Sequence, residues 1–284
     1  MEFGALRPLN TEGTLKLAMM ASGVGSIVEP DELRSLGFHA VQMFFGSGPD
    51  GDGQDPSIAE IDAFLRRTDA VLAAMTLHVD LVDAGGAVPG DIARTIRCLE
   101  KTAALKGHFG DHETPVLIWH PSAYPDGSDA DDRVIFAGLC RALAAVAEAA
   151  EQEGVRVAVE ITRSGSIGSA ETFLRLKDAV TSDALCVCMD AANFTPDRTP
   201  LERAVRMLAP HTVIAHGKDV RFDPTGLVAD YGPIGSGTLD VPAYIRALEA
   251  YAPVPYFVLE YYHDRAELLR ARDIVNRSLS LTRR

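Results

Sequence analysis

Short apolar runs alternate with longer amphipathic segments along the whole chain. Each run is rich in Val, Ile, Leu, Ala or Phe and has the length of one buried strand. The predicted strands cover residues 16–21, 39–43, 75–79, 116–120, 155–161, 185–190, 212–216 and 256–260. Strands that alternate with helices are typical of a parallel sheet with crossover helices, and this number of strands predicts an α/β fold, a (β/α)8 TIM barrel.

Helix-capping residues flank the amphipathic segments. Residues 134–152, "VIFAGLCRALAAVAEAAEQ", are rich in the strongest helix former, and Gly154 follows as a C-cap. Ser169 and Asp240 each stand at the N-cap of a further helix, and a proline lies in the first turn after Asp240. The Gly/Asp/Pro-rich stretches 46–56 and 221–237 are predicted to be long βα loops. No segment is typical of a linker, so residues 1–284 are predicted to form a single domain.

Composition narrows the class of protein. A chain of 284 residues that is 47% hydrophobic can bury a large core. Its net charge is −13, from 40 acidic and 27 basic residues, and such a surface repels phosphodiester backbones, which disfavours a nucleic-acid partner. No leader-like or membrane-spanning apolar stretch is evident, so we predict no membrane association and a cytoplasmic location. The four cysteines are too scattered for a disulfide framework, and Cys186 and Cys188, on one strand face, are interpreted as core residues.

Ionisable residues stand at or near the ends of six predicted strands. The sequence contexts are "VAVEIT" for Glu160, "LCVCMDAANF" for Asp190, "VIAHGKD" for His216, "YFVLEYY" for Glu260, "MTLHVD" for His78 and "VLIWHPS" for His120. The carboxyl ends of parallel strands meet at one mouth of a closed barrel. These side chains are therefore predicted to converge.

The acidic residues among them predict a metal site. A single carboxylate after a strand has ordinary structural explanations, as an N-cap or as the partner of an arginine. Three carboxylates in one semi-buried mouth repel one another, and a divalent cation removes that repulsion. Glu160, Asp190, His216 and Glu260 form a harder donor set than thiolate-rich zinc sites, which favours Mn²⁺ or Mg²⁺ and leaves Co²⁺ and Zn²⁺ open.

The same residues carry a resemblance to a known family. Glu160, Asp190, His216 and Glu260 at the ends of four late strands resemble the Glu-Asp-His-Glu metal set of the sugar isomerase/epimerase family of xylose-isomerase-like barrels. The segment "GSGTLDVPAYIRALE" (235–249) resembles the Gly-x-Gly-x-x-Asp loop and helix before the last strand, and "HGKD" resembles the His-x-Lys-Asp element of that family. One departure is Asn193, where family epimerases commonly place a histidine that holds substrate oxygens.

The resemblance implies a function and assigns residues to it. It implies Glu160 and Glu260 as the catalytic base and acid, each also touching the metal. The expected chemistry is proton abstraction beside a carbonyl through a metal-bound enediolate, by an isomerase or epimerase of a small sugar, keto-sugar or polyol. Return of the proton to the same carbon from the opposite face epimerises, whereas return to the neighbouring carbon isomerises.

Further polar residues are candidates for substrate binding. His78 and His120 bind substrate or a second metal in one interpretation and are structural groups in the other. Asn193 can hydrogen-bond a hydroxyl or carbonyl but cannot be charged. Lys218 can neutralise an enediolate or pair with a neighbouring acid. Two further sets are interpreted as structural, namely Phe44, Phe45 and Trp119 as barrel packing and Arg221 as a solvated loop residue.

Three other functions stay open. A leaving group on the adjacent carbon would make the same chemistry a lyase or dehydratase acting on a keto-inositol or keto-glycoside. A zinc phosphodiesterase of the apurinic endonuclease type resembles this strand order, but the acidic balance and Asn193 disfavour it. A sugar-binding or partner barrel with a vestigial metal set is the non-catalytic alternative. The family resemblance also implies a homo-oligomer, a dimer or tetramer.

Overall fold

The parallel strands of the protein close into a barrel. The computed structural model describes residues 15–46, 54–110, 114–121, 131–162, 165–194 and 200–282. Eight strands pair in the closed order β1-β12-β9-β8-β7-β6-β3-β2. They are β1 (Lys16–Met20), β2 (Phe38–Phe45), β3 (Val71–His78), β6 (Val116–His120), β7 (Arg156–Glu160), β8 (Leu185–Asp190), β9 (Thr212–Gly217) and β12 (Tyr256–Leu259). All eight predicted strands are present, and the fold is the predicted (β/α)8 TIM barrel.

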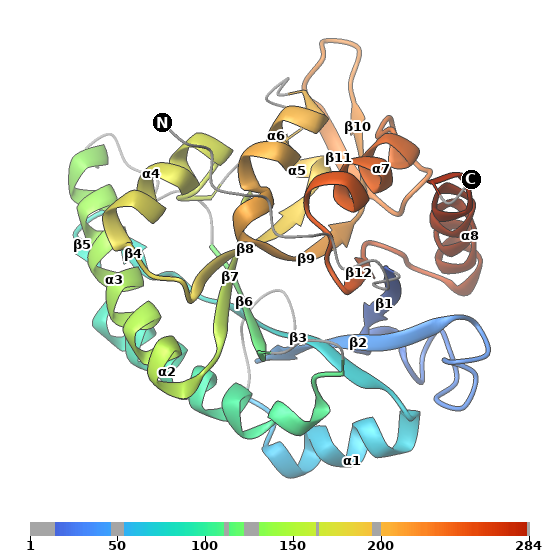
Figure 1. The fold of residues 1–284 in the computed structure, drawn as a ribbon, viewed down its shortest axis with the longest axis horizontal. Coiled ribbons are helices and arrows are strands. Elements are labelled where there is room, and N and C mark those ends of the chain that lie inside the picture. The colour runs from blue at the N-terminus through green and yellow to red at the C-terminus, as the bar shows by residue number, and fades with distance from the viewer. Residues whose placement is uncertain are drawn as a thin grey trace.

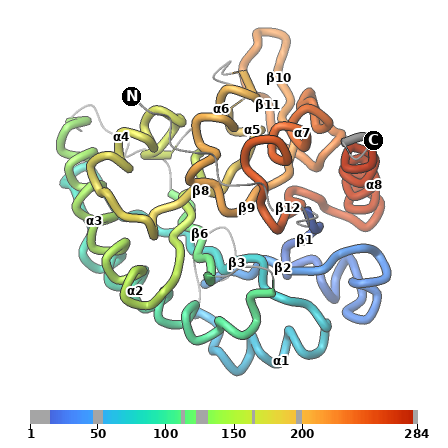
Figure 2. Tube along the Cα trace, viewed as in Figure 1, coloured from blue at the N-terminus to red at the C-terminus, as the bar shows by residue number. Residues whose placement is uncertain are grey.

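Helices surround this ring of strands (Figure 1). They are α1 (Ile58–Thr68), α2 (Pro89–Ala104), α3 (Asp132–Glu153), α4 (Ala170–Val180), α5 (Ala191–Phe194), α6 (Leu201–Leu208), α7 (Val241–Tyr251) and α8 (Arg265–Thr282). Short 3-10 turns follow β1, α2 and α6, namely η1 (Ala21–Gly23), η2 (Lys106–His108) and η4 (Ala209–His211). The tube in Figure 2 follows the chain from β1 through successive strand and helix pairs to α8, which lies beside the start of the barrel.

Local capping explains where several helices begin and end. The Ser169 hydroxyl accepts a hydrogen bond from the Thr172 amide at 3.1 Å, and Asp240 accepts one from Ala243 at 2.9 Å. Gly154 ends α3 in the left-handed region with φ of 66°, which costs glycine little. These three predicted caps are confirmed. Helix α3 begins at Asp132 rather than at residue 134 because Asp131 caps it.

Two predicted segments need correction. Strand β3 begins at Val71 rather than at residue 75, since Ala40 and Val41 of β2 pair with its first residues. The stretch 221–237 is not irregular, because β10 (Asp219–Phe222) and β11 (Val228–Gly232) form an antiparallel hairpin there. A second hairpin, β4 (Val82–Asp83) with β5 (Gly86–Ala87), precedes α2. Residues 47–53 of the predicted loop 46–56 lie outside the described residues.

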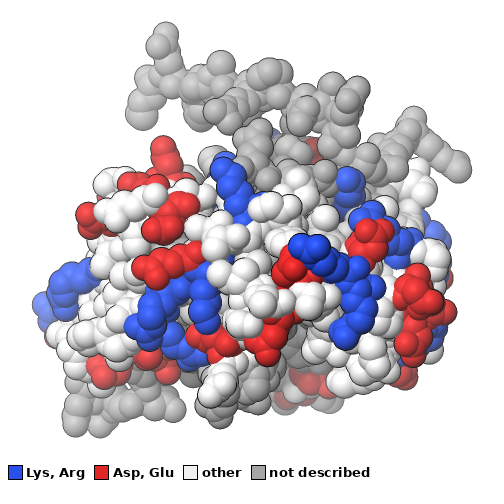
Figure 3. All heavy atoms as spheres, turned by 90° about the horizontal axis from the view of Figure 1, so that it is seen from below, with Lys and Arg blue, Asp and Glu red and all other residues white. Residues whose placement is uncertain are grey.

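The core is continuous from the barrel interior to the inner faces of the helices. Side chains such as Trp119, Phe45 and Phe257 are almost fully buried, so they support the walls of the barrel. Acidic and basic side chains are interspersed on the face seen in Figure 3. None of the helices described here combines the length and the apolar character needed to cross a membrane.

Candidate metal and active site

Four strand ends bring three carboxylates and one imidazole together. Glu160 ends β7, Asp190 ends β8, His216 lies near the end of β9, and Glu260 follows β12. One ligand atom from each of these residues lies within 4.8 Å of the others. The four side chains are between 0% and 9% exposed. The predicted convergence at the carboxyl end of the barrel is therefore present in the structure.

The pairing register of the strands brings the three carboxylates and the imidazole to the same end of the barrel. Asp190 and His216 are direct partners in the β8–β9 ladder. The amide of Glu260 donates to the Gly217 carbonyl at 3.1 Å, which extends the β12–β9 pairing by one residue. Because neighbouring parallel strands are held in this register, their last side chains point into the same mouth.

His216 directs one ring nitrogen toward the acids. Its Nδ1 lies 2.8 Å from Glu260 Oε1 and 3.4 Å from Glu160 Oε2. This buried nitrogen makes no hydrogen bond of regular geometry among the described residues. The other nitrogen, Nε2, lies 2.8 Å from the side-chain oxygen of Gln42. An imidazole nitrogen that points at two carboxylates has the environment of a metal ligand.

Lys218 lies against the same acids. Its Nζ is 2.7 Å from Asp190 Oδ2, 3.4 Å from Glu160 Oε1 and 3.6 Å from Glu260 Oε2. The ammonium group also lies 5.3 Å from the ring centre of Tyr231 and 5.2 Å from that of Tyr261. Of the two interpretations of Lys218 from the sequence, pairing with a neighbouring acid is the one that the structure shows.

The charge state of the cluster follows from burial and from Lys218. Burial raises the pKa of Asp190 to about 6, although the Lys218 ammonium opposes that shift. Burial also disfavours ionisation of Glu160, but Lys218, His216 and His120 together hold its pKa well below the usual range. Burial alone would lower the pKa of Lys218, whereas the surrounding carboxylates raise it well above the ordinary value. The protonation of each carboxylate in the site therefore depends on Lys218, and that of Lys218 depends on the carboxylates.

Cys188 can also reach this group, next to Glu160 and His216. Burial raises the pKa of the Cys188 thiol to about 12, so the thiol is neutral at ordinary pH. Metal ions prefer the thiolate over the thiol. The donor set with three carboxylates is therefore the better metal site, and Cys188 packs in the core as predicted.

Asn193 lies at the edge of the cluster. It belongs to α5, the short turn of helix directly after Asp190, and its Nδ2 lies 3.5 Å from Glu160 Oε1. The amide thus faces Glu160, the carboxylate that the sequence analysis expects to be catalytic. The Asp190 carboxylate accepts the Ala192 amide at 2.9 Å, which fixes the start of this turn.

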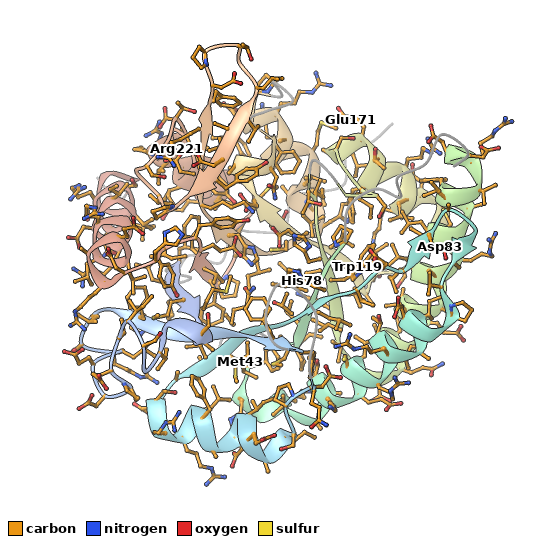
Figure 4. The ribbon with its side chains drawn as sticks, turned by 180° about the vertical axis from the view of Figure 1, so that it is seen from behind. Met43, His78, Asp83, Trp119, Glu171 and Arg221 are labelled. Carbon is orange, nitrogen blue, oxygen red and sulfur yellow. The ribbon has the colours of Figure 1, made fainter. Side chains whose placement is uncertain are left out.

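The two histidines of the early strands stack on each other. His78 and His120 are register partners on β3 and β6, and their rings are parallel with centroids 4.2 Å apart. The Phe44 ring is tilted against His78 at 5.8 Å. Figure 4 shows His78 and Trp119 near the centre of the ring of strands. The two imidazoles therefore form one wall of the barrel mouth.

The remaining sequence candidates are structural. The Trp119 indole donates to the Val79 carbonyl at 2.9 Å and is buried, in agreement with its interpretation as packing. Arg221, on the hairpin that projects from the barrel in Figure 4, forms an exposed ion pair with Asp230. Such a pair stabilises the hairpin only weakly.

The two short motifs of the sequence contact each other. Asp219, the acid of "HGKD", accepts the amides of Gly235 at 3.0 Å and Leu239 at 2.9 Å, both in the loop "GSGTLD". A Cβ at Gly237 would clash with the Val220 carbonyl oxygen, so this close approach requires glycine. The motifs thus hold the loop before α7 against the start of β10, directly after His216 and Lys218.

The sequence interpretation missed Tyr231 and Tyr261, which lie against Lys218, and it missed Gln42. Gln42 of β2 is 1% exposed and contacts His216 from across the barrel. The signal was a single amide inside the apolar run "FHAVQMFF", because a buried polar group requires a hydrogen-bond partner. The partner could not be named before the closure of the barrel was known.

Comparison with known proteins agrees with this architecture. A family model described as a xylose isomerase-like TIM barrel matches residues 30–284. The chain belongs to this family. No curated protein sequence gives a significant match.

Solved structures of other family barrels share the fold. A xylose isomerase domain protein from Alicyclobacillus acidocaldarius superposes with a TM-score of 0.73 at 17% identity, covering 95% of this chain and 100% of that chain. A D-allulose 3-epimerase from Methylomonas sp., in complex with D-allulose, gives 0.66 at 14% identity, covering 95% and 96%. A xylose isomerase-like TIM barrel protein from Mycobacterium smegmatis, in complex with magnesium, gives 0.67 at 15% identity, covering 95% and 98%. At these identities the likeness concerns the fold.

Proposed function

We propose that this protein is a divalent-metal-dependent isomerase or epimerase that acts on a small sugar, keto-sugar or polyol. One observation carries the proposal, namely the convergence of Glu160, Asp190, His216 and Glu260 at the carboxyl end of the barrel. In TIM barrels this end carries the active site. Membership of the xylose isomerase-like family and the D-allulose 3-epimerase among the structural neighbours support the substrate class.

The donor set fits a divalent cation. Three buried carboxylates repel one another, and the Nδ1 atom of His216 lies beside two of them without a regular hydrogen bond. Oxygen-rich donors with a single imidazole suit Mn²⁺ or Mg²⁺, with Co²⁺ and Zn²⁺ as further candidates. The magnesium complex of the Mycobacterium smegmatis neighbour supports this assignment. When bound, such a cation polarises substrate oxygens and stabilises negative charge beside a carbonyl.

Glu160 and Glu260 are the proposed acid and base. Both carboxylates reach the cluster from different strands, β7 and the end of β12, so a substrate held between them can be approached from two sides. One carboxylate removes the proton from the carbon next to the carbonyl, and the other returns a proton. The Lys218 ammonium, 3.4 Å from Glu160, opposes the effect of burial and holds the pKa of this carboxylate below its usual range, so it stays ionised, as a base must be.

Lys218 and Asn193 are the proposed partners of the substrate oxygens. The Lys218 ammonium lies among the acids and can neutralise the negative charge of an enediolate. The Asn193 amide beside Glu160 can donate to a hydroxyl or accept from one. His78 and His120, which stack on each other on the adjacent strands β3 and β6, are the proposed contacts for further hydroxyl groups.

The phosphodiesterase alternative is weaker. Within the described residues, the groups that could hold an ion do not include His78 or His120. These imidazoles stack on each other, whereas the multi-zinc alternative requires them as ligands. The predicted cytoplasmic location and the predicted dimer or tetramer remain predictions.

Solvent exchange tests the proposed function. The cation-loaded protein is incubated in D₂O with a panel of free ketoses and keto-sugars, and deuterium is located by mass spectrometry and NMR. We expect deuterium at a carbon next to the carbonyl, and the product distinguishes epimer, aldose and dehydrated sugar. Absence of exchange with every sugar, together with hydrolysis of a phosphodiester, would overturn the proposal. Absence of both activities would favour the binding or partner role.

A further inference from the structure

Gln42 is a buried polar residue inside an apolar strand. It lies in the middle of β2 and is 1% exposed, and His216, which it contacts, is 0% exposed. The two residues are 174 positions apart in the sequence, and their strands are separated in the ring by β1 and β12. Their hydrogen bond therefore crosses the barrel interior.

The chemistry of the amide decides which nitrogen of His216 carries a proton. The Gln42 oxygen lies 2.8 Å from Nε2 and can only accept a hydrogen bond. Nε2 must therefore donate, and it keeps its proton. The remaining nitrogen, Nδ1, is the one that can offer a lone pair, and it faces Glu260 Oε1 at 2.8 Å and Glu160 Oε2 at 3.4 Å.

The opposite arrangement would block the site. If the amide group of Gln42 were turned by 180°, its NH₂ would donate to Nε2, and the ring proton would lie on Nδ1. That proton would point at Glu260 and occupy the direction in which a cation binds. The orientation of the Gln42 amide thus decides whether the His216 ring presents Nδ1 as a metal ligand or places a proton there.

We propose that Gln42 is a positioning residue that keeps the His216 proton on Nε2 and presents Nδ1 to the divalent cation. The inference rests on the proposed metal site and deepens it. A partner on the second ring nitrogen commonly orients a metal-binding histidine, and its loss weakens metal affinity about 10- to 100-fold. Gln42 supplies this partner from β2, which is separated from β9 in the ring by β12 and β1.

Metal titration of matched variants tests the role of Gln42. Mn²⁺ binding is measured by calorimetry for the wild-type protein, Gln42→Met and Gln42→Glu. Methionine keeps the length of the side chain but removes the acceptor, whereas glutamate keeps the acceptor. We expect the dissociation constant to rise about 10- to 100-fold in Gln42→Met and to stay within about threefold of wild type in Gln42→Glu.

A control separates positioning from general stability. Thr102 of α2 is buried, and its hydroxyl donates to the Cys98 carbonyl at 2.7 Å, away from the strand ends. Thr102→Val should lower the melting temperature without changing the Mn²⁺ dissociation constant. Equal Mn²⁺ affinity of Gln42→Met and wild type overturns the proposal.

A spectroscopic measurement tests Gln42 even if no metal binds. In the metal-free protein, ¹⁵N NMR of the His216 ring, assigned with His216→Asn, should show a slowly exchanging proton on Nε2. That signal should be lost or exchange rapidly in Gln42→Met and persist in Gln42→Glu. The same Nε2 signal in wild type and Gln42→Met would overturn the positioning role. A wild-type protein that binds no Mn²⁺ but shows the expected NMR pattern would contradict the metal site and leave the ring orientation standing.

Discussion

The two ends of the barrel differ in the partners of their polar groups. At the amino end, Lys177 of α4 donates to the carbonyl of Leu185, the first residue of β8, at 2.9 Å. Thr212, the first residue of β9, donates to the Leu208 carbonyl at 3.0 Å. At the carboxyl end, the charged groups of β7, β8, β9 and β12 face one another. The first arrangement satisfies backbone acceptors, and the second concentrates charge.

This difference in polar contacts indicates a structural role for the amino end of the barrel and a functional role for the carboxyl end. Polar groups that satisfy backbone carbonyls stabilise strand ends. Carboxylates packed together do not stabilise a fold, so such a cluster indicates a bound cation or chemistry. In TIM barrels the amino end contributes stability and the carboxyl end contributes catalysis. Changes at the carboxyl end should therefore affect activity and metal binding, and changes at the amino end should affect stability.

The largest expected effect is the loss of turnover in Glu160→Gln and Glu260→Gln. Each substitution removes a proposed acid or base and should lower kcat about 10²- to 10⁴-fold. Melting temperature should fall modestly, because Lys218 and His216 hold both carboxylates in the ionised form and a neutral amide gives up that attraction. Glu151→Gln is the matched control, since Glu151 lies at the amino end and accepts from the Ser182 hydroxyl. Turnover retained by both cluster variants contradicts the catalytic assignment.

Lys218→Met should destabilise the metal-free protein most. It removes the cation that contacts Asp190, Glu160 and Glu260 and leaves buried charge uncompensated, which costs about 3 kcal/mol of unfolding free energy. Added Mn²⁺ should recover much of this loss. Lys177→Met is the comparison at the amino end, with an expected loss of about 1 kcal/mol that Mn²⁺ does not recover. Denaturant melts with and without Mn²⁺ measure the free energy of unfolding of both variants. The same recovery by Mn²⁺ in Lys218→Met and Lys177→Met would contradict the difference between the two ends of the barrel.

Cation binding should itself stabilise the fold. A ligand at about 100 times its dissociation constant adds about 2.7 kcal/mol to the free energy of unfolding. Thermal melts should therefore show a higher melting temperature with Mn²⁺ and a lower one after chelation. Asp190→Asn should abolish most of this shift because it removes a carboxylate of the donor set. A full shift in Asp190→Asn would place the binding site elsewhere.

The smallest expected effect is a pH dependence at the amino end. Burial lowers the pKa of His211, which directly precedes β9, below its ordinary value of 6.5. The unfolded chain therefore takes up this proton more readily than the folded chain, and the free energy of unfolding should fall as pH decreases below about 6.5. His211→Gln should flatten this part of the profile in denaturant melts between pH 5 and 7. An unchanged slope in the variant would exclude His211 as its source.

Much of the barrel and of its mouth could be predicted from the sequence. Each barrel strand is an apolar run with a local pattern, and parallel strand ends must meet at one mouth, so Glu160, Asp190, His216 and Glu260 could be grouped in advance. Caps such as Asp240 depend only on residues three positions away.

The features that the sequence did not predict depend on contacts between residues far apart in the chain. The β10–β11 hairpin has no long apolar run, and its Arg221–Asp230 pair becomes visible only when the strands are paired. The contact of Gln42 with His216 requires the closed barrel, because it joins strands from opposite parts of the ring. The three-way contact of Lys218 with the acids likewise follows from the closure and not from the local "HGKD" pattern.

The number of metal ions bound per chain tests most directly whether the carboxyl end of the barrel, and not the amino end, holds a metal site. The purified protein is dialysed against Mn²⁺ or Mg²⁺, and bound metal is counted by elemental mass spectrometry for wild type, His216→Asn and the amino-end control Glu151→Gln. We predict about one divalent ion per chain in wild type and Glu151→Gln and a strongly reduced content in His216→Asn. No bound metal in wild type, or the same content in all three proteins, would contradict a metal site at the carboxyl end of the barrel.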